Sequence, residues 1–271
     1  MSDELLAISP LDGRYSIESE SLRDYFSEFA YIRDRVKLEV AYLIALSRDV
    51  YMIRDLKPTE LKILDTVADT FSLKEAYKIK EFEKITRHDV KAIENYLRTR
   101  LATTSLSDLL EFLHFGLTSE DVNNLAQSLE LRNSRDKVLL PALIGFLGQL
   151  EDIVRRYKST PMLACTHGQP AVPTTFGKEM AVFYSRLRKQ LKAIQTFEFE
   201  AKLNGAVGNF SALTAAAPDV DWLAFCKGFI NDLELEPNLV TTQIVPYDNW
   251  IEYFNSMHLI NSILLGLCQD M

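Results

Sequence analysis

Residues 178–203 read KEMAVFYSRLRKQLKAIQTFEFEAKL and contain neither glycine nor proline. Apolar side chains recur there at intervals of three and four residues, the spacing of one face of an α-helix. They are Met180, Phe183, Tyr184, Leu187, Leu191, Ile194 and Phe197. At about 1.5 Å per residue, a helix of this length runs roughly 39 Å, as in an extended helical bundle. The stretch therefore predicts a long helix with a wide apolar face.

Two further stretches predict long helices. The first starts at Ser119 and continues to about Tyr157, and Pro141 is expected to bend or interrupt it. The second starts near Asp248 and continues to Met271 without a capping glycine or a basic last turn, as expected of a helix that has been cut.

The first 115 residues predict shorter helices, and a domain boundary is expected near Gly116. These helices are predicted around 20–49, 59–69, 72–83 and 88–103. Strand signals are weak, as at residues 241–245. The sequence thus predicts an all-α fold, with an N-terminal helical domain over residues 1–115 and a central long-helix bundle over residues 116–271.

The composition is that of a globular protein, with 47% hydrophobic and 25% charged residues. The net charge of -8 argues against a nucleic-acid-binding surface, which needs clustered basic residues. The N-terminal MSDELL lacks the basic region of a signal sequence, and no apolar run approaches the roughly 18 residues of a membrane span. We therefore expect a cytoplasmic protein that binds neither nucleic acid nor membrane. Cys165, Cys226 and Cys268 lack metal-ligand spacing and are expected to be reduced.

Residues 166–177 read THGQPAVPTTFG and place a lone histidine, His167, among residues that cannot continue a helix. Pro170 and Pro173 fix the backbone angle φ, while Gly168 permits angles that other residues avoid. We therefore expect a rigid, non-repetitive loop, in which a histidine can exchange a proton near neutral pH. From this segment alone, His167 is either such a group or a turn residue bonded to a nearby carbonyl.

Residues 114–124 read HFGLTSEDVNN, in which Thr118 and Asp121 fit the capping-box pattern of a helix start. Taken alone, these residues fit a capping role. The adjacent hydroxyls of Thr118 and Ser119, with the free amides at the positive end of a long helix, also suit a bound carboxylate. One ligand group could then replace the cap.

Two more segments carry clustered polar side chains. Residues 87–91 read RHDVK and open a helical stretch. Its charged side chains, with Glu94, are expected to form a solvated face, an explanation that fits His88 least well. Residues 9–15 read SPLDGRY, which is either a plain N-terminal turn or a turn that offers an arginine and a phenol to a phosphate or carboxylate.

Taken together and in this order, the segments resemble the adenylosuccinate lyase family of the fumarase/aspartase superfamily. The THGQP form separates this family from the argininosuccinate lyases and fumarases. The motifs that carry the resemblance span the whole chain: SPLDGRY at 9–15, RHDVKA at 87–92, HFGLTSEDVNN at 114–124, THGQPA at 166–171, NGAVG at 204–208 and TTQI at 241–244.

The resemblance implies a lyase that cleaves adenylosuccinate to AMP and fumarate. It also implies cleavage of succinylaminoimidazole-carboxamide ribotide to its carboxamide and fumarate, in purine synthesis. In such a β-elimination a base removes a proton beside a carboxylate, the resulting aci-carboxylate needs electrostatic support, and an acid protonates the departing nitrogen. The resemblance implies no metal and no organic cofactor.

The same match assigns roles to individual residues. It implies that His167 is the general acid and His88 a second catalytic residue. It implies that Thr118 and Ser119 bind the succinyl carboxylates. The other implied substrate contacts are Arg14 and Tyr15, which would hold the phosphate, and Arg87, Asp89, His114, Thr166 and Gln243.

One signature of the family is absent from the chain. A glycine-serine-methionine-proline-lysine-asparagine loop that carries the catalytic serine base is expected after Met271. We therefore expect the N-terminal part of a longer enzyme, inactive alone, whose sites are shared between the subunits of a homotetramer. The alternatives are a superfamily lyase that acts on argininosuccinate or a simpler dicarboxylate, and a non-catalytic helical scaffold whose histidines are structural.

Overall fold

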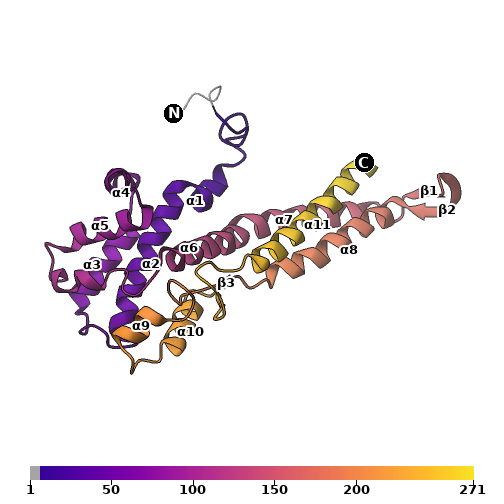
Figure 1. Cartoon of the computed structure of the whole chain (residues 1–271). Coiled ribbons are helices and arrows are strands. Elements are labelled where there is room, and N and C mark those ends of the chain that lie inside the picture. The colour runs from indigo at the N-terminus through magenta and orange to yellow at the C-terminus, as the bar shows by residue number, and fades with distance from the viewer. Residues whose placement is uncertain (1–6) are drawn as a thin grey trace. The chain divides into compact units, whose positions relative to one another are not determined.

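The computed structural model describes residues 7–271 (Figure 1). Residues 1–6, which underlie the expectation that there is no signal sequence, lie outside the described residues. Helices hold 65% of the residues and strands 6%, so the predicted all-α class is confirmed. The chain forms two compact units, which we call unit 1 (Met1–Arg132 and Phe199–Pro246) and unit 2 (Asn133–Glu198 and Tyr247–Met271). The domains predicted as residues 1–115 and 116–271 are not tested by this grouping of contacts and stay a prediction.

Unit 1 is built from short and medium helices, and the shorter helices predicted before residue 104 are confirmed in outline. Its 3-10 helices are η2 (Glu20–Leu22) and η3 (Ser107–Phe112), and its short strands are β3 (Glu200–Ala201) and β4 (Glu236–Pro237). Its α-helices are α1 (Arg23–Phe26), α2 (Glu28–Arg48), α3 (Pro58–Asp69), α4 (Leu73–Thr86), α5 (Asp89–Leu101), α9 (Ser211–Ala216), α10 (Trp222–Asp232) and most of α6 (Ser119–Ser134).

Helix α2 carries much of the apolar core of unit 1. Ser27 caps its N-terminus, since the side-chain oxygen accepts a first-turn amide N–H at 3.2 Å. The Tyr42 ring packs edge-on against Phe225 and Phe229 of α10, with ring centroids 5.9 Å apart in both pairs. The Tyr42 hydroxyl donates to the carbonyl of Phe115 at 2.8 Å. Helix α2 therefore holds the segment that leads into α6.

Glu94 of α5 does not lie on the solvated face that was expected. The residue is only 7% exposed. It accepts hydrogen bonds from Lys91 Nζ at 2.8 Å and from Arg98 Nε at 2.9 Å. Burial raises the pKa of Glu94, but the two cations outweigh burial and hold this pKa below its ordinary value. The expectation was wrong because helical spacing shows which residues share a face and not what covers that face.

Unit 2 contains three long helices and a hairpin. Its elements are the π-helical η4 (Arg135–Leu139), α7 (Leu140–Arg156), β1 (Pro161–Thr166), β2 (Gln169–Thr175), α8 (Phe176–Gln195) and α11 (Asp248–Asp270). Helices α7, α8 and α11 run side by side in Figure 1 and share one apolar core. That core contains Leu143, Leu147 and Leu150 of α7, Met180, Phe183, Leu187 and Ile194 of α8, and Ile260, Ile263 and Leu267 of α11.

Helix α8 ends at Gln195, earlier than the predicted end at Leu203. From Phe199 onward the chain belongs to unit 1, where β3 pairs in parallel with β4. Next to β3, the Lys202 N–H donates to Asn124 Oδ1 at 2.8 Å. These partners are distant in the sequence, so long-range contacts override the local helical pattern.

The other two long helices agree with the sequence in outline. The helix predicted from Ser119 to about Tyr157 is present as α6, η4 and α7. The widened π-helical turn ends at Leu139, two residues before Pro141, whose ring nitrogen has no hydrogen to donate. The helix predicted from Asp248 is confirmed as α11. None of the helices between residues 7 and 271 is both long and apolar enough to cross a membrane.

The expectation of a non-repetitive loop at residues 166–177 was wrong. Strands β1 and β2 pair in antiparallel fashion, and Thr166 stands opposite Gln169. His167 and Gly168 are therefore the turn residues, and both have positive φ, 52° and 70°. Two such residues define a type I′ turn, which suits a two-residue hairpin. Both prolines of β2 are tolerated because this strand pairs on one edge only in the described chain.

At Gly208 of unit 1 a close backbone approach leaves no room for a side chain. Its φ is +75°, and a Cβ added there would lie 2.1 Å from the carbonyl oxygen of Thr241. We expect Gly208→Ala to lower the free energy of unfolding by about 1–3 kcal/mol, because the clash adds to an unfavourable φ. Urea unfolding followed by circular dichroism measures this change.

Gly228 provides the matched control for that substitution. It lies in α10 of the same unit, and an added Cβ there meets nothing within 4 Å. Gly228→Ala should therefore stabilise the protein by about 0.4–1 kcal/mol. Equal effects of the two substitutions would contradict the proposed backbone contact.

Candidate active site

His88 is the N-cap residue of α5. Its Nδ1 accepts the backbone N–H of Lys91 at 3.2 Å. Because this bond occupies Nδ1 as an acceptor, the proton of the neutral ring lies on Nε2. Nε2 is 3.4 Å from the hydroxyl oxygen of Ser119, the first residue of α6. The cap thus directs His88 toward the start of a second helix, while 52% of its side chain stays exposed.

Asp89, the next residue, is held as an anion by a buried arginine. Arg35 Nη1 donates to Asp89 Oδ2 at 2.5 Å, and the Arg35 side chain is 3% exposed. Burial raises the pKa of Asp89, but the hydrogen bond and charge of Arg35 outweigh burial and lower this pKa below its ordinary value. Asp89 is therefore suited to orient neighbours rather than to remove a proton. Sequence reasoning missed Arg35, which lies inside α2 and in no motif.

His114 is paired with a buried carboxylate, Glu39 of α2. The His114 N–H donates to Glu39 Oε2 at 3.2 Å, and Nδ1 lies 2.6 Å from Glu39 Oε1. The Glu39 side chain is 1% exposed. Burial favours the neutral ring, but the hydrogen bond and charge of Glu39 outweigh burial and raise the pKa of His114. Within residues 7–271 the Nε2 of His114 has no hydrogen-bond partner, so this nitrogen is available to a ligand.

This pairing makes the stability of unit 1 depend on pH. The folded protein binds a proton at His114 more tightly than the unfolded chain does, because the pKa lies above its ordinary value of 6.5. The contribution to stability is therefore complete below pH 6.5 and is lost as the pH rises through the raised pKa. We expect the free energy of unfolding to fall over this interval in a urea series from about pH 6 to about pH 9.

Two variants test that assignment. His114→Gln removes the titrating ring, and Glu39→Gln removes its charged partner. Both should abolish this part of the pH dependence. An unchanged slope in both variants would show that the slope comes from other groups.

Helix α6 begins with two hydroxyl residues, Thr118 and Ser119. The Thr118 N–H donates to Asp121 Oδ2 at 2.9 Å, which is one half of a capping box. The Thr118 hydroxyl has no hydrogen-bond partner in the described part of the chain. Asp121 provides this half of the capping box, and both hydroxyls stand at the positive end of α6. The capping prediction thus holds for Asp121, and carboxylate binding by the hydroxyls stays a prediction.

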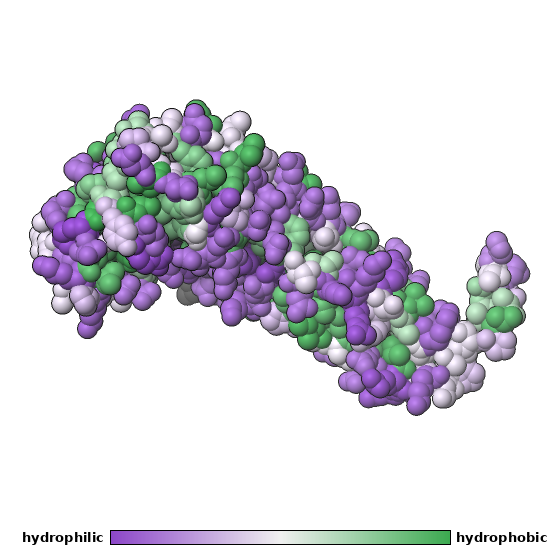
Figure 2. Space-filling model, turned by 90° about the horizontal axis from the view of Figure 1, so that it is seen from below, coloured by the Kyte–Doolittle hydropathy of each residue, from purple (hydrophilic) through white to green (hydrophobic). Residues whose placement is uncertain are grey.

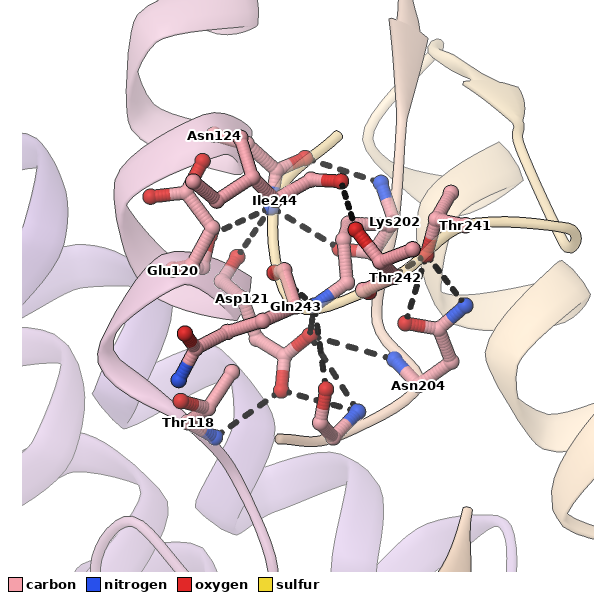
Figure 3. A network of polar contacts seen from close by, with 11 residues as sticks. Thr118, Glu120, Asp121, Asn124, Lys202, Asn204, Thr241, Thr242, Gln243 and Ile244 are labelled. Atoms are coloured by element: carbon pink, nitrogen blue, oxygen red, sulfur yellow. Dashed lines mark hydrogen bonds and ion pairs between the residues drawn. The ribbon is translucent and has the colours of Figure 1, made fainter. Parts of the chain in front are cut away.

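Gln243 reaches the start of α6 from a distant loop. Residues 241–245, where a weak strand signal was noted, form no strand. The Gln243 carbonyl accepts Lys202 Nζ at 2.8 Å. In Figure 3 the side-chain amide of Gln243 extends toward Thr118. Unit 1 therefore gathers His88, Ser119, Thr118 and Gln243 around one helix end.

Other predicted residues of unit 1 are not joined to this group. Arg87 is exposed and ends α4 in the left-handed conformation, with φ of 51°. The Arg14 guanidinium lies 5.6 Å from the ring centroid of Tyr15. In the described residues neither Arg14 nor Tyr15 has a polar contact with His88, Thr118 or the other grouped residues. Their phosphate-binding role stays a prediction.

Thr166 and His167 belong to unit 2, where they are exposed at the hairpin turn. His167 makes no hydrogen bond to another described residue. No such bond therefore supports the alternative of a turn histidine bonded to a nearby carbonyl. The role of His167 as an acid stays a prediction. Cys165, beside Thr166, is exposed and forms no disulfide, and Cys226 is buried.

No cluster of three or more His, Cys, Asp or Glu side chains that could hold a metal ion occurs in residues 7–271.

A family model described as lyase matches residues 13–271 of the chain. The chain therefore belongs to this lyase family. Its relatives include adenylosuccinate lyases from Buchnera aphidicola subsp. Acyrthosiphon pisum (42% identical over 98% of this chain), Haemophilus influenzae (40%, 98%) and Escherichia coli K12 (39%, 98%). The resemblance inferred from the motifs is thereby confirmed. The chain spans 59% of the length of each of these relatives.

Solved structures support the fold. A fumarate lyase from Mesorhizobium sp. BNC1 superposes with a TM-score of 0.76 at 21% identity, over 93% of this chain and 56% of that one. A 3-carboxy-cis,cis-muconate lactonizing enzyme from Pseudomonas putida superposes with a TM-score of 0.73 at 18% identity, over 93% and 55%. At these identities the likeness concerns the fold alone.

Proposed function

We propose that this chain contributes to a lyase that cleaves adenylosuccinate to AMP and fumarate by β-elimination, and that also cleaves succinylaminoimidazole-carboxamide ribotide in purine synthesis. The substrate is proposed from the similarity to adenylosuccinate lyases. The observation that carries the reaction class is the pair of hydroxyls at the positive end of α6, with His88 Nε2 3.4 Å from one of them. The proposal includes a cytoplasmic location.

The charge on each part of the substrate suggests which residue would meet it. The succinyl group carries carboxylates, and removal of the adjacent proton places further negative charge on one of them. The amides at the start of α6 and the hydroxyls of Thr118 and Ser119 would stabilise that aci-carboxylate. His88 and Gln243 would orient the group, and His114 would meet a second anionic part of the nucleotide. His167 would give a proton to the departing nitrogen.

We further propose that the sites are shared between the subunits of a homotetramer. The hairpin that carries His167 exposes Met162, Leu163 and Val172 by 40–64%. The long helices expose further apolar side chains, among them Ile251, Phe254 and Leu265. Figure 2 shows this apolar surface on the hairpin and along the helices of unit 2. Such patches favour association, and an isolated hairpin is only marginally stable in water. Light scattering, which reports the mass of the assembly, tests this proposal.

The lyase proposal is tested by fumarate release. Adenylosuccinate, succinylaminoimidazole-carboxamide ribotide, argininosuccinate and aspartate are offered separately to the protein as its organism produces it, and fumarate is followed by absorbance. Turnover of the two purine intermediates alone supports the proposal. Turnover of argininosuccinate or aspartate alone would replace it with the other superfamily activities, and no turnover of any substrate would favour the scaffold alternative.

A further inference from the structure

A buried ion pair lies directly beneath the candidate active site. Lys202 Nζ is 2.8 Å from Asp121 Oδ1, and both side chains are 0% exposed. The ammonium group also donates to the carbonyl of Gly205 at 3.1 Å and to the carbonyl of Gln243 at 2.8 Å. Each of its three N–H groups therefore has a partner, and one of these partners is the backbone of a proposed substrate-binding residue.

The carboxylate of Asp121 accepts hydrogen bonds from further backbone groups of the same region. Its Oδ2 accepts the N–H of Thr118 at 2.9 Å and that of Gly205 at 3.1 Å, and its Oδ1 accepts the N–H of Asn204 at 3.1 Å. Figure 3 shows these bonds converging from the first turn of α6, from the segment after β3 and from the loop of Gln243. Segments about 80 residues apart in sequence are thus joined through two side chains.

The energetics argue that this pair does more than stabilise the fold. Removing two charges from water is costly, and apolar side chains of similar volume are often at least as stabilising as a buried ion pair. What apolar side chains cannot provide is a set of directed bonds. Here two of these bonds end on the backbones of Thr118 and Gln243, which are proposed substrate-binding residues. The others end on the backbone of the segment that holds Asn204 and Gly205.

We propose that Lys202 and Asp121 are positioning residues of the active site, which fix the first turn of α6 against the backbone of Gln243. They touch no substrate. They act through Thr118, whose amide Asp121 holds, and through Gln243, whose carbonyl Lys202 holds. This inference rests on the proposed lyase function for its link to turnover, and on hydrogen-bond geometry alone for its link to structure.

The test replaces Lys202 with methionine, which has a similar length and no charge. Two properties are measured: amide hydrogen exchange at Thr118, Asn204 and Gly205, and kcat and KM for adenylosuccinate. We expect at least a 10-fold loss of exchange protection at these amides relative to the rest of α6. A misplacement of about 1 Å costs on the order of 100-fold in kcat/KM, and we expect kcat to fall as well as KM to rise.

The control is Arg54→Met, which breaks another ion pair with a buried partner. Arg54 donates to Glu60 at 2.9 Å, the Glu60 side chain is 0% exposed, and neither residue bonds to the site. At a temperature where both variants are fully folded, Arg54→Met should keep its turnover. If Lys202→Met does not fold, the double variant Lys202→Met with Asp121→Asn leaves no unpaired buried charge and is measured instead.

The outcomes separate the two proposals. A folded Lys202→Met protein with unchanged protection at Thr118 and Gly205 overturns the positioning role, as does lost protection with wild-type kcat and KM. An equal loss of turnover in the Arg54→Met control reduces the pair to a stabilising role. A wild-type protein without lyase turnover contradicts only the proposed function, and amide exchange then decides alone whether the pair positions these segments.

Discussion

Replacing His167 with asparagine should lower lyase turnover by roughly 100- to 10,000-fold, the usual contribution of a general acid. The substitution is chosen for the backbone. His167 adopts a φ of 52°, and asparagine tolerates positive φ better than most residues. Asn-Gly is also a favoured pair in type I′ turns, so the hairpin should keep its register while the imidazole is lost.

The measurement compares fumarate release with circular dichroism and the oligomeric mass of the same preparation. His258→Gln serves as the matched control, because His258 is an exposed histidine on α11 of the same unit. The His258→Gln protein should turn over substrate at the wild-type rate. Near-normal turnover in a folded His167→Asn protein would remove His167 from the mechanism.

The second large effect is expected when both Thr118 and Ser119 are replaced by alanine. Loss of donors that support the developing aci-carboxylate should lower kcat by about 100- to 1,000-fold, and loss of ground-state binding should raise KM. The structure limits the side effect on folding. The Thr118 bond to Asp121 uses the backbone N–H and survives the substitution.

Stability must be separated from catalysis in that experiment. Ser27→Ala is the matched control, because the Ser27 side chain caps α2 in the same unit and lies outside the proposed site. Loss of this cap should lower the free energy of unfolding by about 0.5–2 kcal/mol without changing kcat or KM. A double variant of Thr118 and Ser119 that loses stability in the same way and keeps wild-type kinetics would leave capping as the only role of these hydroxyls.

Much of the fold could be predicted from the sequence because helices are encoded locally. The apolar spacing in residues 178–203 predicts the face that α8 presents to α7 and α11, and Met180, Phe183, Leu187 and Ile194 do lie in that core. The same spacing predicts α11 from Asp248 onward. Periodicity of this kind needs no information about distant parts of the chain.

Part of the candidate site could also be predicted from the sequence, for a related reason. Motifs such as HFGLTSEDVNN place hydroxyls at a helix start, and this position follows from breakers and caps within a few residues. The family resemblance drew on the same segments. What these motifs do not contain is the set of buried partners that orient them, namely Arg35 behind Asp89, Glu39 behind His114 and Lys202 behind Asp121.

Tertiary structure alone decided the remaining features, because each depends on a partner far away along the chain. Helix α8 stops at Gln195 because the following residues pair with β4 and with Asn124, and not because a local breaker intervenes. Lys202 is one lysine among many in the sequence. It becomes distinctive only when folding removes it from water beside Asp121, since burial turns a solvated charge into one that must be bonded on all sides.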